Sequence, residues 1–72
     1  MKEFVIYEDW DKITFDIVKL NEETQQVYVA ITKQGRISLI AYPLLEDENG
    51  LYFEYGPFYK KIYIDDFEEV ND

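Results

Sequence analysis

Carboxylates are the reactive side chains that this chain carries in quantity, with 16 Asp and Glu against 7 Lys and Arg. It contains no Cys and no His, the residue types that supply the commonest nucleophiles, general bases and transition-metal ligands. Paired carboxylates can catalyse glycoside hydrolysis, but only inside a cleft that a chain of 72 residues can hardly form. We therefore expect a protein that is not an enzyme, with no catalytic residue and no cofactor.

The acidic run Asp47–Gly50 is the strongest candidate for a metal site. In a calcium loop of the EF-hand type, a glycine occupies the sixth position and carboxylates lie at the first and twelfth. Aligning Gly50 with the sixth position puts Leu45 first and Gly56 twelfth, so both end ligands are absent. The run is better explained as a solvated turn, and we expect no metal ligands.

The net charge of −9 restricts the partners that the protein can bind. A negative surface repels phosphate backbones and anionic lipid, so we expect no nucleic acid and no membrane among them. Lys60 and Lys61 follow two aromatic residues, yet two lysines among so many acids are better explained as protection of an edge strand. The expected partner is a basic protein.

Composition indicates one folded domain over residues 1–72. Apolar residues make up 47% and aromatic residues 18%, more than a disordered acidic tail carries. Without Cys, stability must come from packing or from association with another chain. Residues 1–8 lack the apolar run of a signal peptide, and no segment approaches the ~20 apolar residues of a membrane span. We expect a cytoplasmic protein.

Alternation of apolar and polar residues with a period of two runs through the chain and predicts β-strands. We predict an all-β fold: a five- or six-stranded antiparallel meander that forms a curved sheet or an SH3-like small barrel. Asp65 lies three residues before Glu68, a capping-box-like spacing that predicts a short C-terminal helical turn through Val70. The predicted strands include 4–7, 13–17, 27–32, 37–45, 51–55 and 62–64.

The segment Lys33-Gln34-Gly35 sets the predicted register of the central hairpin. Its glycine suits the left-handed position of a type I turn with a G1 bulge, which pairs Thr32 with Arg36. This register puts the apolar residues of both strands on one face, as a buried sheet surface requires. The predicted pairs are Ile31 with Ile37, Val29 with Leu39, and Val27 with Ala41.

Strand parity then predicts a second, aromatic face on the sheet. Tyrosine supplies a large, rigid contact area with a polar tip, and neighbouring acids would select a basic segment. Alternatively, barrel curvature, the terminal helical turn or a second copy of the chain in a homodimer covers this face. The predicted protein-binding residues are Tyr28, Tyr42, Tyr52, Tyr63, Asp16 and Glu54, with Val18 and Ile40 on the same face.

Two resemblances add to this interpretation. Leu51–Tyr55 is similar to the aromatic and acidic opening motif of SH3 domains, although the tryptophan pair of that family does not follow it. The acidic turns and the closing segment Ile62–Phe67 resemble in style the small uncharacterised acidic proteins of bacterial phages and conjugative elements. That resemblance implies a protein that binds and blocks a host protein, in some cases by imitating the charge of DNA.

Three hypotheses for function therefore stay open. The first is a protein-binding module that uses the tyrosine face with its flanking acids. The second is a DNA mimic that inhibits a host DNA-binding protein, and the third is a structural homo-oligomer that buries the tyrosine face. A mimic would use the carboxylates of Glu8, Asp9, Asp11, Glu46, Asp47, Glu48, Asp65, Asp66, Glu68 and Glu69.

Overall fold

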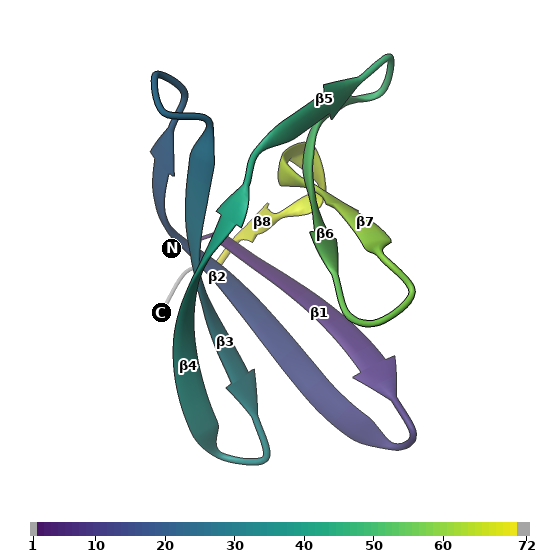
Figure 1. Cartoon of the computed structure of the whole chain (residues 1–72). Helices are drawn as coiled ribbons and strands as arrows, with labels where there is room; N and C mark the ends of the chain where they lie inside the picture. Colours follow the sequence, from purple (N-terminus) through teal and green to yellow (C-terminus); the bar gives the residue numbers. More distant parts are fainter. Residues whose placement is uncertain (1, 71–72) are drawn as a thin grey trace.

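The computed structural model describes residues 2–70 and confirms the prediction of an all-β, antiparallel fold (Figure 1). It contains more strands than predicted, because the predicted strand 37–45 is divided at Leu44 and the end of the described chain forms a further short strand. The elements are β1 (Lys2–Glu8), β2 (Asp11–Asn21), β3 (Gln26–Lys33), β4 (Arg36–Pro43), β5 (Leu45–Asp47), β6 (Gly50–Tyr55), β7 (Lys60–Tyr63), the 3-10 turn η1 (Ile64–Asp66) and β8 (Glu68–Glu69).

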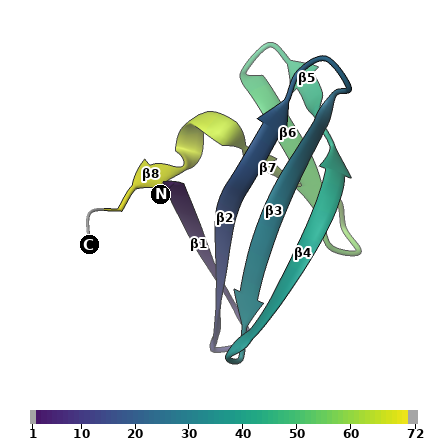
Figure 2. The ribbon, with the colours of Figure 1, turned by 90° about the vertical axis from the view of Figure 1, so that its left-hand side faces the viewer.

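The strands form two sheets. The larger sheet has the order β4-β3-β2-β1-β8, in which β1 to β4 are the predicted meander and β8 pairs with the other side of β1. The smaller sheet has the order β5-β6-β7. Figure 2 shows the smaller sheet lying across one face of the larger one, behind β2, β3 and β4. We call the face of each sheet that points toward the other its inner face, and the opposite face its outer face.

The chain passes from one sheet to the other at Leu44, between β4 and β5. The Leu44 N–H donates to the Gln25 carbonyl across 2.9 Å, and the Leu44 side chain is buried. Pro43 ends β4, and a proline is tolerated at this edge because its missing N–H would point away from β3. A backbone bond and a buried side chain thus fix the crossing between the sheets.

The core lies between the two inner faces. Period-two alternation buries Ile13 and Phe15 of β2 and Val27, Val29 and Ile31 of β3, as the sequence predicts. The Phe15 and Phe53 ring centroids lie 6.2 Å apart across the layer, and both side chains are fully buried. Because there is no disulfide, this layer must stabilise the fold. The buried residues are Ile13, Phe15, Val27, Val29, Ile31, Leu44, Phe53, Ile62 and Phe67.

The C-terminal turn is shorter than predicted. It covers only Ile64–Asp66, and its N-cap residue is Tyr63, which makes no side-chain capping bond. The capping role predicted for Asp65 is therefore wrong, because Asp65 lies within the turn. Phe67 follows immediately, and its ring centroid lies 5.6 Å from that of Phe4 and 6.4 Å from that of Phe53. Burying this ring returns the chain to β1, where β8 forms instead of further helix.

The register between β3 and β4 differs by one residue from the prediction. Lys33 pairs with Arg36, so the loop consists only of Gln34 and Gly35. Both have positive φ, 51° and 75°, which is the type I′ geometry whose twist matches a two-residue hairpin. The predicted type I turn with a G1 bulge was wrong, because Gln34 also adopts the left-handed conformation. The observed pairs include Thr32 with Ile37, Ile31 with Ser38, Val29 with Ile40, and Val27 with Tyr42.

A one-residue slip moves every side chain of β4 to the opposite face. Ile37 and Leu39, which the sequence predicted to be buried, lie on the outer face and are 73% and 66% exposed. Ile40 and Tyr42, predicted for the outer face, lie on the inner face instead. Tyr42 stacks on Phe53 with ring centroids 4.9 Å apart.

This register predicts different costs for the same substitution at two isoleucines. Ile62→Ala should lower the free energy of unfolding by about 2–5 kcal/mol, because Ile62 is buried and its loss leaves a cavity. Ile37→Ala should cost less than about 1 kcal/mol, because Ile37 is exposed. Urea denaturation measures both. Equal costs would contradict the register, because Ile37 is buried only in the bulged alternative.

Candidate functional site: an exposed edge strand and its cleft

β4 forms one edge of the larger sheet, and Figure 2 shows no further strand of that sheet beyond it. Residues 36–41 of this strand are all exposed, and four of them are apolar. Edge strands usually carry charges that discourage pairing with another chain. β4 has one charged residue, Arg36, at its beginning. The strand therefore has the apolar, unpaired edge on which another strand can add.

The backbone of β4 presents free hydrogen-bonding groups along this edge. In an antiparallel pair, residues bonded to the partner alternate with residues whose N–H and C=O point away from it. The hydrogen bond from the Leu44 N–H to the Gln25 carbonyl shows that the even-numbered residues of β4 are the ones bonded to β3. Ile37, Leu39 and Ala41 therefore point their backbone groups outward, and the side chains of the same three residues lie on the outer face.

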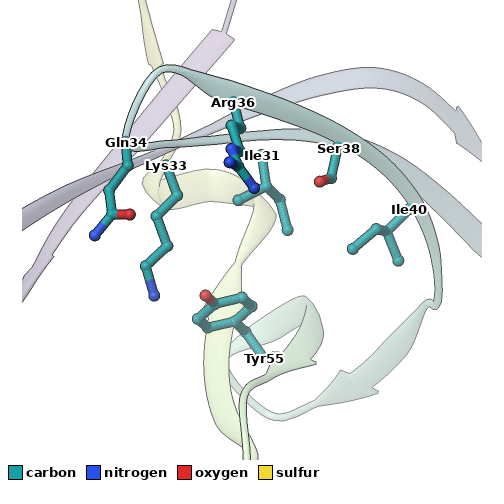
Figure 3. A pocket seen from close by; sticks show the side chains of 7 residues that line it. All are labelled: Ile31, Lys33, Gln34, Arg36, Ser38, Ile40 and Tyr55. Atoms are coloured by element: carbon teal, nitrogen blue, oxygen red, sulfur yellow. The ribbon is translucent and has the colours of Figure 1, made fainter.

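A cleft of about 310 Å³ opens beside β4 on the inner face of the larger sheet. Its apolar part comes from β3, β4 and the end of β6. Figure 3 shows the Lys33 and Arg36 side chains extending from the hairpin toward the Tyr55 ring, which faces them from the smaller sheet. The Tyr55 ring packs edge-on against Phe15, with centroids 4.9 Å apart. The lining residues are Ile31, Lys33, Gln34, Arg36, Ser38, Ile40 and Tyr55.

The two cations of the cleft have no carboxylate partner within residues 2–70. Among the described residues, an ion pair joins Lys61 to Asp47 on the smaller sheet, away from the cleft. Lys33 and Arg36 take part in no ion pair within that range. The Asp11 carboxylate comes to the tip of the hairpin, where it accepts a hydrogen bond of 3.0 Å from the Gln34 side chain. No acidic residue lines the cleft, although the chain has 16. The cleft is thus locally positive on a negative protein.

The structure does not bring the six predicted binding residues together on one face. Tyr28 and Asp16 lie on the outer face of the larger sheet, whereas Tyr52, Tyr63 and Glu54 lie on the outer face of the smaller sheet. Tyr42 lies between the sheets, where burial raises the pKa of its hydroxyl. The prediction of a single tyrosine face was therefore wrong, because it treated the chain as one sheet with a bulged β3–β4 turn.

The tyrosines of the smaller sheet are engaged in internal contacts. The Asp47 carboxylate accepts hydrogen bonds from the Tyr63 hydroxyl, at 2.7 Å, and from the Lys61 ammonium, at 3.0 Å. These bonds lower the pKa of Asp47 to about 2. The bond to Asp47 also raises the pKa of Tyr63 and that of Lys61. Lys61 Nζ lies 4.7 Å from the Tyr52 ring centroid. These contacts connect β5, β6 and β7.

The two predicted residues of the larger sheet have different environments. Tyr28 is partly buried, and its hydroxyl donates to the Gln26 side-chain oxygen across 3.0 Å. Asp16 pairs across the sheet with Glu3 on one side and Ala30 on the other. Its Oδ1 atom is buried and has no hydrogen-bond partner. Neither residue contributes to the cleft beside β4.

The acidic turns proposed for a DNA mimic do not form one surface. Figures 1 and 2 both place the β1–β2 turn, with Glu8 and Asp9, at the opposite end of the molecule from the β5–β6 turn, with Glu48. A mimic needs carboxylates at phosphate-like intervals along a continuous surface. The arrangement gives this hypothesis no geometric support.

Trp10 is a further exposed residue with an unusual backbone. With Asp9 it forms the two-residue turn between β1 and β2, and both have positive φ, 48° and 73°. Its side chain is 100% exposed. A left-handed conformation costs a non-glycine residue about 1–2 kcal/mol. An exposed tryptophan kept at such a position is a candidate anchor for a partner.

Sequence reasoning missed Lys33 and Arg36 as residues that line one cleft, and Ile37 and Leu39 as exposed residues of the adjacent edge. The available signal was the dipeptide Gln34-Gly35 between two alternating runs, which also fits a two-residue hairpin. Within residues 2–70, no group of three or more acidic side chains is placed to hold a metal ion. In the same range, no helix has the length and hydrophobicity needed to cross a bilayer.

Comparison with known proteins adds no relative: no protein family, no curated protein and no solved structure matches this chain. The function must therefore be argued from the surface itself.

The Asp47 contacts predict a pH dependence. Because folding lowers the Asp47 pKa from 3.8 to about 2, the ionised carboxylate stabilises the fold fully above its ordinary pKa. That contribution is lost as the pH falls toward 2. Tyr63→Phe removes the largest cause of the shift, so the Asp47 pKa should rise toward its ordinary value. NMR titration of the Asp47 carboxyl carbon measures this pKa in the wild type and in Tyr63→Phe. An unchanged pKa in the variant would contradict the role of this bond.

The Trp10 backbone predicts that Trp10→Gly stabilises the protein. Glycine adopts positive φ without steric cost, so the free energy of unfolding should rise by about 1 kcal/mol. Tyr7→Gly is the matched control, because Tyr7 is an exposed aromatic residue within β1, where glycine weakens the strand. Urea denaturation measures both variants. A Trp10→Gly chain less stable than the wild type would show that Trp10 packs within the fold.

Proposed function

We propose that this protein is a non-enzymatic binding module that acts through protein contact, and that its contact surface is centred on β4. The observation that carries the proposal is the run of exposed residues 36–41 on an edge strand with outward-pointing backbone groups. An extended segment of another protein can pair with such an edge, gaining affinity from backbone hydrogen bonds and specificity from alternate side chains.

The apolar character of β4 supports this use of the edge. Ile37 and Leu39 present adjacent branched side chains on the outer face, and Ala30 and Thr32 of β3 lie beside them. Exposed apolar residues that gather on one strand mark interaction surfaces more reliably than scattered ones. Soluble proteins block their edges with inward charges, bulges or covering loops, and β4 has none of these along residues 37–42.

The proposal moves the binding surface away from the predicted tyrosine residues. A basic partner was predicted because acids flank the tyrosine face, and the structure divides that face among three locations. β4 contains no acid, so it gives no support to a basic partner. A protein partner, a cytoplasmic location and an origin in a mobile element remain parts of the proposal that rest on the sequence alone.

A homodimer is the second candidate function, because the exposed edge of β4 can pair with the same edge of a second copy. In an antiparallel pair of two β4 strands centred on Leu39, Ile37 of each copy would lie opposite Ala41 of the other. The outer face would then carry a continuous apolar cluster. Sedimentation equilibrium distinguishes a stable dimer from a monomer that keeps β4 free.

The proposal predicts that Leu39→Thr weakens partner binding by about ten-fold or more, because a buried leucine contributes about 1.5–3 kcal/mol. Val18→Thr is the matched control, since Val18 is also exposed, at 59% against 66%, but lies on β2. Affinity capture followed by titration of the purified partner measures the difference. Hydrogen exchange should show the amides of Ile37 and Leu39 protected in the complex.

Two results would contradict the proposal. One is a partner that binds Leu39→Thr as tightly as the wild type and Val18→Thr. The other is a complex in which the amides of β4 exchange as fast as in the free protein. In either case the contact surface would lie elsewhere on the molecule.

A further inference from the structure

We propose that the cleft beside β4 binds the carboxylate side chain of an extended acidic segment, which pairs with β4 as an added strand. The inference rests on the proposed function and specifies the chemistry of the partner. It assigns two roles: β4 supplies the backbone pairing, and Lys33 with Arg36 selects the acid. The selected chemistry is opposite to what the net charge of −9 would suggest.

The charge of the cleft supports an anionic occupant. Lys33 and Arg36 extend into it without an ion-pair partner among residues 2–70, and no acid lines it. Two other clefts on the molecule are lined differently, one with Glu3, Asp66, Glu68 and Glu69, the other with Glu22 and Glu46. A carboxylate would therefore be attracted to the β4 cleft and repelled by these two. Arginine can hold a carboxylate through two parallel hydrogen bonds.

The apolar part of the cleft specifies a second side chain. Ile31 is buried at its base, Ile40 lines it from β4, and the Tyr55 ring closes it from the smaller sheet. A volume of about 310 Å³ is at the lower limit of ligand pockets, which suits one or two side chains. An apolar side chain of the partner would pack here, next to the carboxylate.

Strand geometry fixes the spacing between these two side chains. Successive residues of a strand point to opposite faces, so residues two apart enter the same cleft. The residue opposite Arg36 would be the acid, and the residue two positions away, opposite Ser38 and diagonally next to Ile40, would be apolar. The intervening residue would pack on the outer face against Ile37 or Leu39. The segment thus has an acid and an apolar residue at positions i and i+2, with apolar residues between and beside them.

A second copy of the chain fits this cleft less well. β4 has no acid, so β4 paired with itself brings no carboxylate to Lys33 or Arg36. It would also place the Arg36 side chains of the two copies on one continuous sheet. An acidic segment of a different protein satisfies both the unpaired edge and the unpaired cations.

The test adds a capped peptide, Thr-Val-Asp-Val-Ile-Val-Thr, to the full chain. Binding is measured by NMR from the change in the amide chemical shifts of the protein. We expect shifts at β4 and binding about ten-fold weaker for the same peptide with Asn in place of Asp, because a charge-assisted hydrogen bond is stronger than a neutral one. Arg36→Gln should weaken the Asp peptide by a similar factor and leave the Asn peptide unaffected. Lys19→Gln is the matched control, because it changes the net charge equally at an exposed position on β2.

A third peptide separates this inference from the proposed function. N-methyl groups on alternate residues block strand pairing without changing the side chains, so this peptide should not bind. If the Asp and Asn peptides bind equally while the methylated one fails, strand addition stands and acid selection is overturned. If the methylated peptide binds as well as the others, strand addition itself is wrong. No binding of the Asp peptide to the wild type, or a stable dimer that it cannot dissociate, would overturn the inference.

Discussion

The two-residue turn at Gln34–Gly35 is the constraint on which the surface of this protein depends. Its two positive φ angles give a type I′ hairpin, and that geometry pairs Lys33 with Arg36. One more residue in the loop would turn Ile37 and Leu39 inward and Ile40 and Tyr42 outward. The exposed apolar edge, the cleft beside β4 and the stacking of Tyr42 on Phe53 all follow from this local geometry.

The small size of the chain explains why so much apolar surface remains outside. A domain of about 60 residues buries only ~60% of the surface of its unfolded chain. Here the smaller sheet has three strands and the larger has five, so it cannot cover every strand of the larger. It covers the middle of β2 and β3, where Ile13, Phe15, Val27, Val29 and Ile31 are buried, and leaves most of β4 uncovered. The cleft is the space between the uncovered strand and Tyr55 at the end of β6.

Charge is distributed so that the edge differs from the rest of the molecule. Several turns carry acids, among them Asp9, Glu22, Glu23 and Glu48, and repulsion between copies at these turns opposes aggregation. Residues 36–43 contain a single charge, and it is positive. An unprotected apolar edge strand promotes aggregation unless another chain covers it. This contrast is the physical basis for placing the function at β4 and for choosing an acidic segment as its occupant.

The sequence by itself determined the fold class, because period-two alternation and turn residues act over a few neighbours and need no tertiary context. The buried residues of β2, β3, β6 and β7 follow from that alternation, as Phe15, Val29, Phe53 and Ile62 show. Only the tertiary structure decided which side chains of β4 lie on the inner face, because Gly35 suits two hairpin geometries that differ by one residue. It also decided the division into two sheets, since the crossing at Leu44 depends on a bond to the distant Gln25. The six predicted binding residues were separated for the same reason. Alternation tells which residues share a face only within one sheet of known register, and tertiary packing determines both the sheets and the register.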